Sequence, residues 1–238
     1  MNILVTGCSR GVGLEICKVL LEQGCTVYGV ARSHTAEYSA LESQYEGRAL
    51  FLPLDLSDAK NAYDTFRKYF KEIEIDGYVN NAAMAYDDIV TNMNLDRLHA
   101  MFDVNVFTPM LVTKYIIRNM LLHKTKGSIV HISSISVHTG YKGLAMYAAS
   151  KGALEAFSKD TAREWGVMGI RSNIVAPGFM ATSMSASLSE EQRDKIYART
   201  SLKAETSIRS VAEMVAFLLS EKACSITGQV MHVDNGTI

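Results

Sequence analysis

The chain has 238 residues, of which 48% are hydrophobic and 21% charged, and its formal net charge is -1 at neutral pH. This composition is typical of a soluble globular protein with a full core, and the near-zero charge gives no sign of a nucleic-acid or membrane surface. The N-terminal segment lacks the basic stretch and long apolar run of a secretion signal, so we expect a cytoplasmic protein. The four cysteines lack the spacing of a zinc site or a redox pair, and we expect four buried thiols and no bound metal.

Seven short apolar runs predict β-strands: NILVTG, TVYGVA, ALFLPL, DGYVNN, GSIVHIS, RSNIVAPG and QVMHVD. Helical spacing or composition between them predicts helices over 12–23, 36–45, 58–72, 94–122 (long enough for two helices), 147–166 and 207–220. Continuously apolar strands separated by helices are typical of a parallel sheet that is covered on both faces. We therefore predict one α/β domain over residues 1–238. Residues 177–189 are small and polar, and we expect a substrate lid over about 177–200.

Three glycines directly follow the first predicted strand. Gly7, Gly11 and Gly13 lie in LVTGCSRGVGLEI, where that strand passes into the first helix. A dinucleotide pyrophosphate needs such a turn, because a backbone without Cβ atoms lets it approach and the N–H groups of the helix start bind its oxygens. The alternative is a turn that only joins strand and helix.

The second predicted strand ends without the carboxylate that NAD-selective sites place there. Ala31 stands at that position and Arg32 follows it. Arg32 and Arg10 can form a cationic pocket for the 2′-phosphate of NADPH, since guanidinium groups pair with phosphate oxygens through two hydrogen bonds. The sequence therefore favours NADPH, and two solvated surface arginines are the alternative.

Tyr147 and Lys151 stand one helical turn apart in YAASK, so their side chains share a face of the predicted helix. Reducing a ketone leaves negative charge on its oxygen, which calls for a proton donor aimed at that atom. A free tyrosine titrates near 10, and a nearby ammonium lowers that value. We predict that Tyr147 is the acid and that Lys151 lowers its pKa.

These motifs together resemble the short-chain dehydrogenase/reductase family over essentially the whole chain. TGCSRGVG is similar to the family's TGxxxGxG turn, NNAA at 80–83 to its NNAG element and YAASK to its YxxxK pair. Ser134 lies thirteen residues before Tyr147, the interval usual in the family, and Asn105 in DVNVF matches its catalytic-helix asparagine. Through TGCSRGVG and VAPGFMATSM the chain most resembles the 3-oxoacyl-(acyl-carrier-protein) reductases.

The resemblance implies a doubly wound sheet of the Rossmann type and an NADPH-dependent reduction of a ketone, with a 3-oxoacyl thioester as the leading substrate. Its catalytic residues would be Asn105, Ser134, Tyr147 and Lys151: Ser134 bonds the substrate carbonyl, Lys151 also holds the nicotinamide ribose, and Asn105 holds a water that returns the proton. The cofactor would be bound by Gly7, Ser9, Arg10, Gly11, Val12, Gly13, Arg32, Asp55, Leu56, Asn81, Ala82, Tyr147, Lys151, Pro177, Gly178 and Thr182. For Asp55 a turn or helix-capping role is the alternative.

The resemblance leaves several points open. Ala83 and Asn235 stand where the family has glycine, which puts the local backbone geometry in question. An acyl carrier protein is a candidate partner, with Lys124, Lys126 and Arg171 as its candidate contacts. Relatives pair helices corresponding to 94–122 and 147–166 across subunits, which suggests a homotetramer or homodimer. The alternative functions are a reductase of a sugar, steroid, polyketide-type or other small ketone, and an NADPH-binding sensor without turnover.

Overall fold

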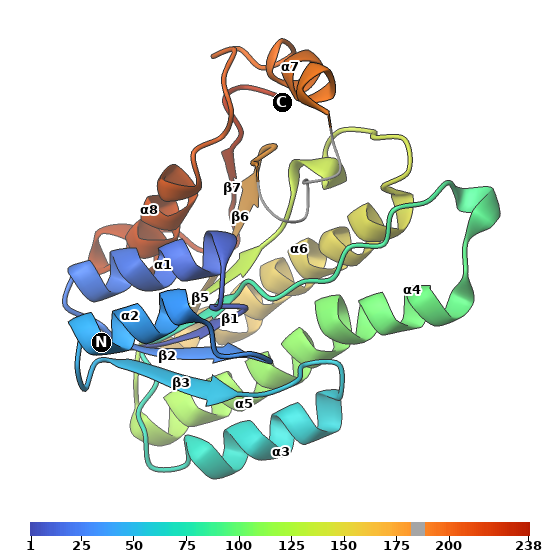
Figure 1. The fold of residues 1–238 in the computed structure, drawn as a ribbon. Coiled ribbons are helices and arrows are strands. Elements are labelled where there is room, and N and C mark those ends of the chain that lie inside the picture. Colours follow the sequence, from blue (N-terminus) through green and yellow to red (C-terminus); the bar gives the residue numbers. More distant parts are fainter. Residues whose placement is uncertain (182–188) are drawn as a thin grey trace.

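The structure is a computed structural model and describes residues 1–181 and 189–238. Within these residues seven parallel strands form one sheet, in the order β3-β2-β1-β4-β5-β6-β7 (Figure 1). The order reverses direction between β1 and β4, and in such sheets ligands bind where the carboxyl ends of those two strands diverge. The strands are β1 (Asn2–Thr6), β2 (Thr26–Ala31), β3 (Ala49–Pro53), β4 (Gly77–Asn80), β5 (Ser128–Ile132), β6 (Arg171–Pro177) and β7 (Val230–Val233).

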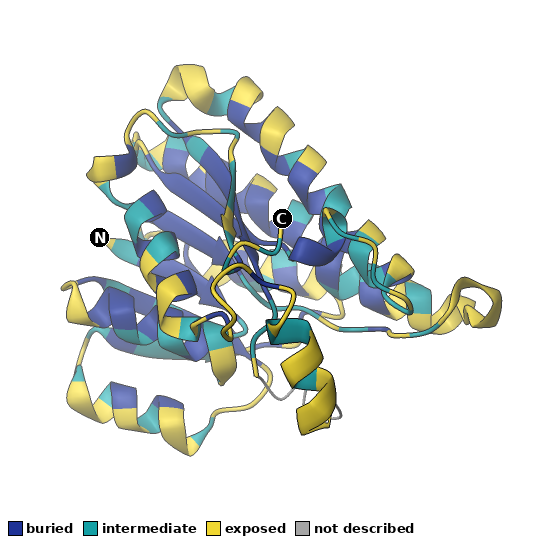
Figure 2. Ribbon diagram, turned by 90° about the horizontal axis from the view of Figure 1, so that it is seen from above, coloured by how far each residue is buried: buried dark blue, intermediate teal, exposed yellow. Residues whose placement is uncertain are grey.

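Helices cover both faces of the sheet (Figures 1 and 2). One face packs against α1 (Gly11–Glu22), α2 (Ala36–Gln44) and α8 (Ile208–Leu219). The other packs against α3 (Ala59–Tyr69), α5 (Thr108–His123) and α6 (Ala145–Trp165), with α4 (Leu95–Phe102) leading into α5. The predicted doubly wound α/β fold with about seven strands is thereby confirmed.

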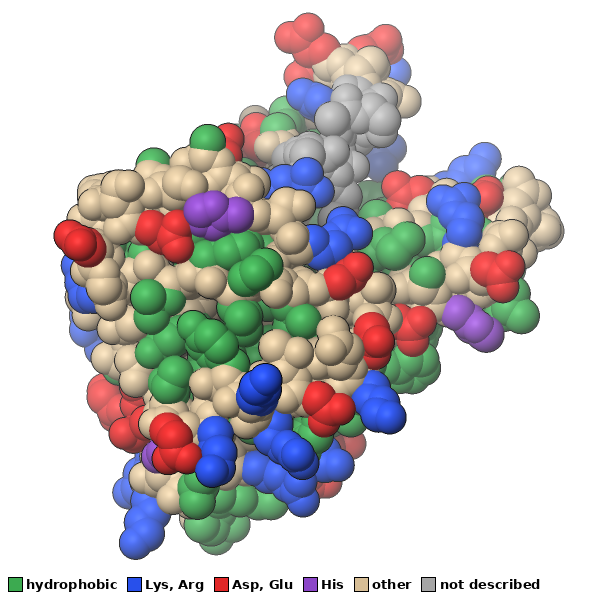
Figure 3. Space-filling model, turned by 60° about the horizontal axis from the view of Figure 1, so that its bottom comes forward, with side chains coloured by type: hydrophobic (Ala, Val, Ile, Leu, Met, Phe, Trp, Pro, Cys, Tyr) green, Lys and Arg blue, Asp and Glu red, His purple; other side chains and the backbone are tan. Residues whose placement is uncertain are grey.

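The strands are mostly apolar because both of their faces are buried, although buried polar residues such as Ser128, His131 and Asn173 also occur in them. In β5 the side chain of Val130 joins the core beneath α1 and α8, and its neighbour Ile129 joins the core beneath α3 and α5. Successive side chains of a strand point to opposite faces, so hydrophobic residues are needed on both of them. The edge strand β3 is only half buried at its centre, and apolar side chains are accordingly visible among charged ones on the face that Figure 3 shows.

The predicted helical range 94–122 is interrupted at its centre. Asp103–Phe107 forms one π-helical turn between α4 and α5, and Asn105 within it is fully buried. Such turns insert an extra residue into a helix and are frequent at functional sites. Sequence periodicity gives no signal for this turn, because the apolar spacing on either side of it is that of an ordinary helix.

Two other features differ from the sequence-based expectations. The structure contains a further helix, α7 (Glu190–Tyr197), beside the C-terminal residues, within the predicted lid of about 177–200, where no helix was expected. It has no buried residue and begins with a capping box in which Ser189 and Gln192 exchange hydrogen bonds, so local bonding sets its start. Cys224 is exposed, and only the other three thiols are buried as predicted.

Within the described ranges, no helix has the length and apolar character that crossing a membrane requires.

Candidate active site

The residues singled out from the sequence gather at the carboxyl edge of the sheet. The glycine turn follows β1, Asn81 follows β4, and Ser134 follows β5. Tyr147 and Lys151 lie near the start of α6, in its first two turns. The crevice at the reversal of strand order therefore holds both the candidate cofactor site and the candidate catalytic groups.

The glycine turn is closed by contacts that leave no room for side chains. Gly7 has a φ of +69° and its N–H donates to the carbonyl oxygen of Val30 at 2.8 Å. The Asn81 amide donates to the carbonyl oxygens of Thr6 (3.0 Å) and Gly7 (3.1 Å). A Cβ on Gly13 would lie 2.1 Å from the oxygen of Gly7. Asn81 therefore holds the turn in shape, and glycine is required at positions 7 and 13.

The amino end of α1 is open toward the crevice. Arg10 precedes the helix without a side-chain cap, and the first turn carries no acidic residue. An ideal Cβ on Gly11 would meet no atom within 4 Å. The Thr35 hydroxyl donates to the carbonyl oxygen of Ser9 at 2.9 Å and ties the turn to the start of α2. Uncapped N–H groups and space in front of them fit a pyrophosphate.

The two arginines predicted to bind a 2′-phosphate are both exposed. Asp55 accepts a hydrogen bond from the N–H of Ser57 at 3.0 Å, and this bond is the main reason that its pKa is lowered, with the charge of Arg32 adding to the effect. Asp55 therefore takes part in a turn, which was its alternative role, and lies within electrostatic reach of Arg32. Leu56 is buried, with its carbonyl oxygen bound by the Thr108 hydroxyl at 2.8 Å.

Lys151 is 1% exposed, and its ammonium has one hydrogen bond within the described residues, to the carbonyl oxygen of Ile132 at 2.8 Å. Its Nζ lies 5.8 Å from the centroid of the Tyr147 ring. Burial lowers the pKa of Lys151 from its ordinary 10.5 to about 8. An ammonium has three N–H donors, and a buried one with a single protein acceptor fits the hydroxyls of a bound ribose.

The expectation that Lys151 lowers the pKa of Tyr147 is not met. Burial, followed by the negative charge of Asp87, raises the pKa of Tyr147 from 10 to about 12. The phenol ring packs on a small apolar cluster, and this removal from water outweighs the distant ammonium. Tyr147 therefore holds its proton at neutral pH. The cluster consists of Tyr86, Met101 and Met146. Asp87, from the loop after β4, escaped sequence reasoning because only the fold brings it near Tyr147.

Ser134 and Asn105 differ in how much hydrogen-bonding capacity they leave free. Ser134 Oγ accepts from the N–H of Ser136 at 3.1 Å, so its own O–H can still be donated. The Asn105 amide accepts from the N–H of Met84 (2.8 Å) and donates to the oxygen of Met84 (2.9 Å) and to Ser150 Oγ (3.0 Å). Its side chain thus joins the loop after β4 to α6, and its role in holding a water stays a prediction.

The end of β6 packs closely on the segment after β7. Pro177 ends β6, the N–H of Gly178 donates to the oxygen of Val233 at 2.8 Å, and a Cβ on Gly178 would lie 2.4 Å from the Thr206 hydroxyl. Asn235 adopts the left-handed backbone (φ +57°) that a glycine would take, a conformation that asparagine tolerates. Thr182 and the lid residues 182–188 lie outside the described residues.

The three basic residues suggested as contacts for a carrier protein lie at the wrong edge. Lys124 and Lys126 precede β5, and Arg171 begins β6, so all three are at the amino ends of strands whose carboxyl ends carry the candidate site. The Arg171 guanidinium donates to the oxygens of Leu218 (2.7 Å) and Ser220 (3.2 Å) and thereby caps α8. Their positions exclude Lys124, Lys126 and Arg171 as contacts for a carrier protein that docks beside the crevice.

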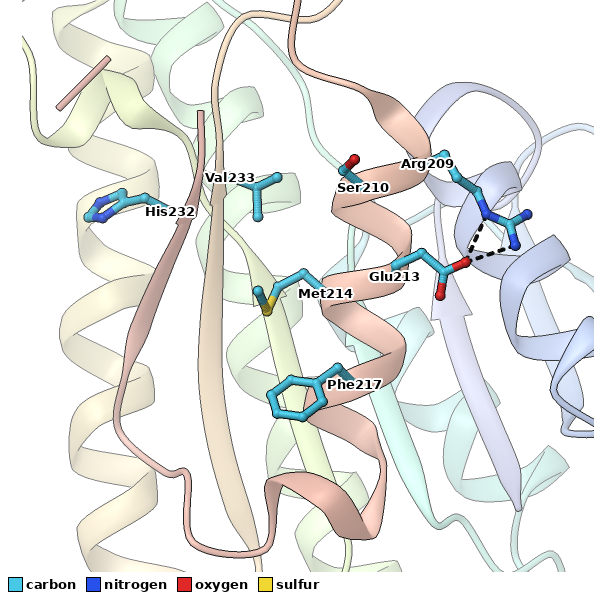
Figure 4. Close-up of a pocket in the computed structure, with 7 residues that line it drawn as sticks. All are labelled: Arg209, Ser210, Glu213, Met214, Phe217, His232 and Val233. Atoms are coloured by element: carbon cyan, nitrogen blue, oxygen red, sulfur yellow. Dashed lines mark hydrogen bonds and ion pairs between the residues drawn. The ribbon is translucent and has the colours of Figure 1, made fainter. Parts of the chain in front are cut away.

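Two surface hollows also lie away from the candidate site. One, of about 490 Å³, runs between α8 and β7 (Figure 4). The other, of about 600 Å³, lies on the outer side of α3. Neither is lined by a residue predicted from the sequence to bind cofactor or substrate. Within the described ranges no group of three or more potential metal ligands comes together.

Comparisons with known proteins agree with this geometry. A family model described as enoyl-(acyl carrier protein) reductase matches residues 7–237. The 3-oxoacyl-[acyl-carrier-protein] reductase FabG of Salmonella typhimurium is 35% identical over 237 residues, which cover 98% of this chain and 95% of that protein. The protein of the same name from Escherichia coli (strain K12) has the same identity and coverage.

Solved structures are similar over the same extent. A short chain dehydrogenase/reductase family protein superimposes with a TM-score of 0.88 at 28% identity, covering 99% of this chain and 96% of that one. The structure of ElxO with NADP bound has a TM-score of 0.89 at 28% identity and covers 99% and 98%. The family model and the named relatives mention different reductions, and they agree on the family. On sequence, fold and site arrangement, the chain belongs to the short-chain dehydrogenase/reductase family.

Proposed function

We propose that this chain is an NADPH-dependent ketoreductase, with a 3-oxoacyl thioester as the substrate class that its relatives favour. Membership of the family makes it an oxidoreductase acting on CH–OH and C=O groups. The observation that carries the proposal is the buried Lys151, with two ammonium donors unassigned, beside a protonated Tyr147 at the edge that also holds the glycine turn. That combination suits hydride transfer followed by protonation at one place.

Bound NADPH would supply the hydride. The glycine turn and the amino end of α1 would hold its pyrophosphate, Arg10 and Arg32 its 2′-phosphate, and Lys151 its nicotinamide ribose. One solved relative supports the phosphorylated cofactor, since ElxO has NADP bound. The further contacts remain those expected from the resemblance: Ser9, Val12, Asp55, Leu56, Asn81, Ala82, Pro177, Gly178 and Thr182.

The chemical role of each catalytic side chain follows from its surroundings. Tyr147 keeps its proton at neutral pH and donates it to the carbonyl oxygen as negative charge develops there. The Ser134 O–H donates to the same oxygen, so that two donors stabilise the charge. Lys151, with a pKa of about 8, is mostly charged near pH 7 and stabilises the phenolate that remains. At neutral pH the phenol is therefore in the protonated form that reduction requires, whereas oxidation of the alcohol requires the ionised form.

The substrate and partners are assigned by analogy with named relatives. Since the FabG proteins are named for a carrier-bound 3-oxoacyl group, we propose a thioester of this kind, with an acyl carrier protein as candidate partner. A cytoplasmic homotetramer or homodimer is the assembly expected from the family. The polar groups of the crevice come from the chain itself, so turnover with a short soluble thioester does not need a carrier.

The test is NADPH oxidation, followed by absorbance, with an acetoacetyl thioester. Tyr147→Phe removes the proton donor and keeps the ring, so we expect a loss of about 10²- to 10⁴-fold in kcat with NADPH affinity retained. Tyr69→Phe, on the exposed end of α3, is the control and should behave as wild type. Unchanged turnover in Tyr147→Phe would refute the assigned acid, and NADPH binding without turnover of any ketone would favour a sensor.

A further inference from the structure

A second buried charge lies on α6, one helical turn beyond Lys151. Glu155 is 7% exposed, and side chains four residues apart on a helix lie on the same face. Removing a carboxylate from water is costly unless charges and hydrogen bonds compensate it. The groups that bind Glu155 therefore indicate what this charge holds in place.

Glu155 binds the chain on both sides of Ser134. The Ser133 hydroxyl donates to Glu155 Oε1 at 2.5 Å, within the protein interior. His138 Nε2 lies 3.1 Å from each of the two carboxylate oxygens. The residue before Ser134 and the residue four positions after it are thus attached to one carboxylate.

Lys151 holds the same segment from the preceding turn of α6, through the carbonyl oxygen of Ile132. Two successive turns of one helix therefore fix the strand end from which Ser134 projects. The N–H of Ser133 adds a bond to the oxygen of Val175 on β6 at 2.8 Å. A helix and a central strand are rigid supports, which a donor in a reaction site needs.

The far side of the network contacts the edge strand β7 through His232, an exposed residue. The ring of His138 meets the ring of His232 edge to face, with 4.6 Å between the centroids. Figure 4 shows His232 on the side of β7 away from Met214 and Phe217, which line the groove against α8. His232 thus faces the same side of the sheet as α6 and packs on the ring of His138.

We propose that Glu155 is a positioning residue that holds the Ser134 hydroxyl toward the carbonyl oxygen of the substrate, acting through Ser133 and His138. This inference rests on the proposed function, in which Ser134 donates to that oxygen. A shift of about 1 Å in a reacting group is enough to lower the rate on the order of 10²-fold, so loss of this support has a measurable effect.

The first measurement compares two substitutions of the carboxylate. Glu155→Leu removes both charge and acceptor, whereas Glu155→Gln keeps an oxygen that Ser133 can donate to. For Glu155→Leu we expect kcat to fall about 10- to 100-fold with NADPH affinity unchanged, and Glu155→Gln to recover much of this loss. The control is Glu164→Leu, at an exposed position of the same helix, which should leave kcat unaltered.

The decisive measurement repeats Glu155→Leu in a Ser134→Ala background. If Glu155 acts through Ser134, its substitution has almost no further effect on kcat once the hydroxyl is gone, because the two residues then serve one step. Equal losses in both backgrounds, or an unchanged kcat in Glu155→Leu, would overturn the proposal. If Glu155→Leu does not fold, Ser133→Ala removes only the hydroxyl bond and takes its place in the same cycle.

These outcomes separate the inference from the proposed function. If the wild-type protein reduces no ketone, the proposed function is wrong. If it does reduce a ketone but Ser134→Ala retains full kcat, the proposed function stands, while the role of Ser134 and with it the positioning role of Glu155 are wrong. If Ser134→Ala lowers kcat and the loss from Glu155→Leu simply adds to it, the proposed function stands and the positioning role of Glu155 is wrong.

Discussion

Replacing Lys151 by methionine should abolish turnover and at the same time stabilise the folded protein at neutral pH. The ammonium is buried with a single acceptor, so folding removes it from water without full compensation. Methionine has nearly the same length and carries no charge. Residues that an enzyme needs for activity often lower the stability of its folded state.

The magnitude follows from the pKa of Lys151, which falls from 10.5 to about 8 on folding. At about 1.4 kcal/mol per unit, the difference is on the order of 3 kcal/mol of destabilisation at pH 7. Methionine also leaves the oxygen of Ile132 unpaired, which costs about 1–3 kcal/mol. The net gain expected at pH 7 is therefore about 1 kcal/mol.

The pH dependence gives the sharper test. Between about pH 8 and 10.5 the unfolded wild-type chain holds a proton at Lys151 that the folded protein has lost, so Lys151 contributes a rise in the free energy of unfolding with pH in this window. Buried thiols with raised pKa values contribute a fall in the same window, and the Met variant lacks only the contribution of Lys151. Buried thiols and Tyr147 contribute equally to both proteins, so the difference between the two isolates Lys151.

Urea unfolding at several pH values between 7 and 10 measures this difference. Lys159→Met, at an exposed position of α6, is the matched control and should follow the wild-type curve. A Met variant that is clearly less stable at pH 7, or whose free energy of unfolding has the same pH dependence as that of the wild type, would contradict the reasoning.

Two further predictions concern the cofactor and the acid. Arg32→Ala should weaken NADPH binding about 10- to 100-fold and change NADH binding by less than about twofold, because a charge-assisted hydrogen bond contributes about 1.5–3 kcal/mol; equal losses in a fluorescence titration would remove the case for phosphate recognition. Asp87→Asn should lower the pKa of Tyr147, since the charge of Asp87 raises it. The rate of alcohol oxidation, which needs the ionised phenol, should then rise at lower pH than in wild type, and an unshifted pH profile would exclude the interaction.

The fold class was predictable from the sequence because the buried strands are rich in apolar residues. In β5 every residue is buried, and its three aliphatic residues, Ile129, Val130 and Ile132, indicate a strand although Ser128 and His131 between and beside them are polar. The same reasoning missed α7, whose exposed residues carry no apolar stripe. Its capping box at Ser189 and Gln192 was the available signal. The sequence predicted a doubly wound parallel sheet but not which strands pair. The pairing of β1 with β4, for example, joins segments more than seventy residues apart.

The site residues could be predicted where they lie close together in one segment of the sequence. They could not be predicted where the fold brings distant residues together. The glycine turn and the Tyr147–Lys151 pair are local patterns. The raised pKa of Tyr147 depends on burial of the phenol and then on Asp87, sixty residues earlier, and the support of Ser134 depends on Glu155. The sequence marks neither acidic residue, because only the fold brings the exposed Asp87 near Tyr147 and only packing buries Glu155.

The π-helical turn at Asp103–Phe107 makes this part of the chain sensitive to length in an unusual way. Each residue of an α-helix advances the rotation by about 100°, so deleting one residue here would leave an unbroken helix whose amino-terminal part is turned by that angle. The segment would lose no regular hydrogen bond, yet Asn105 would swing away from Met84 and Ser150. Deleting a single codon in this turn is thus expected to leave the helix intact and to remove the Asn105 hydrogen bonds that join the loop after β4 to α6.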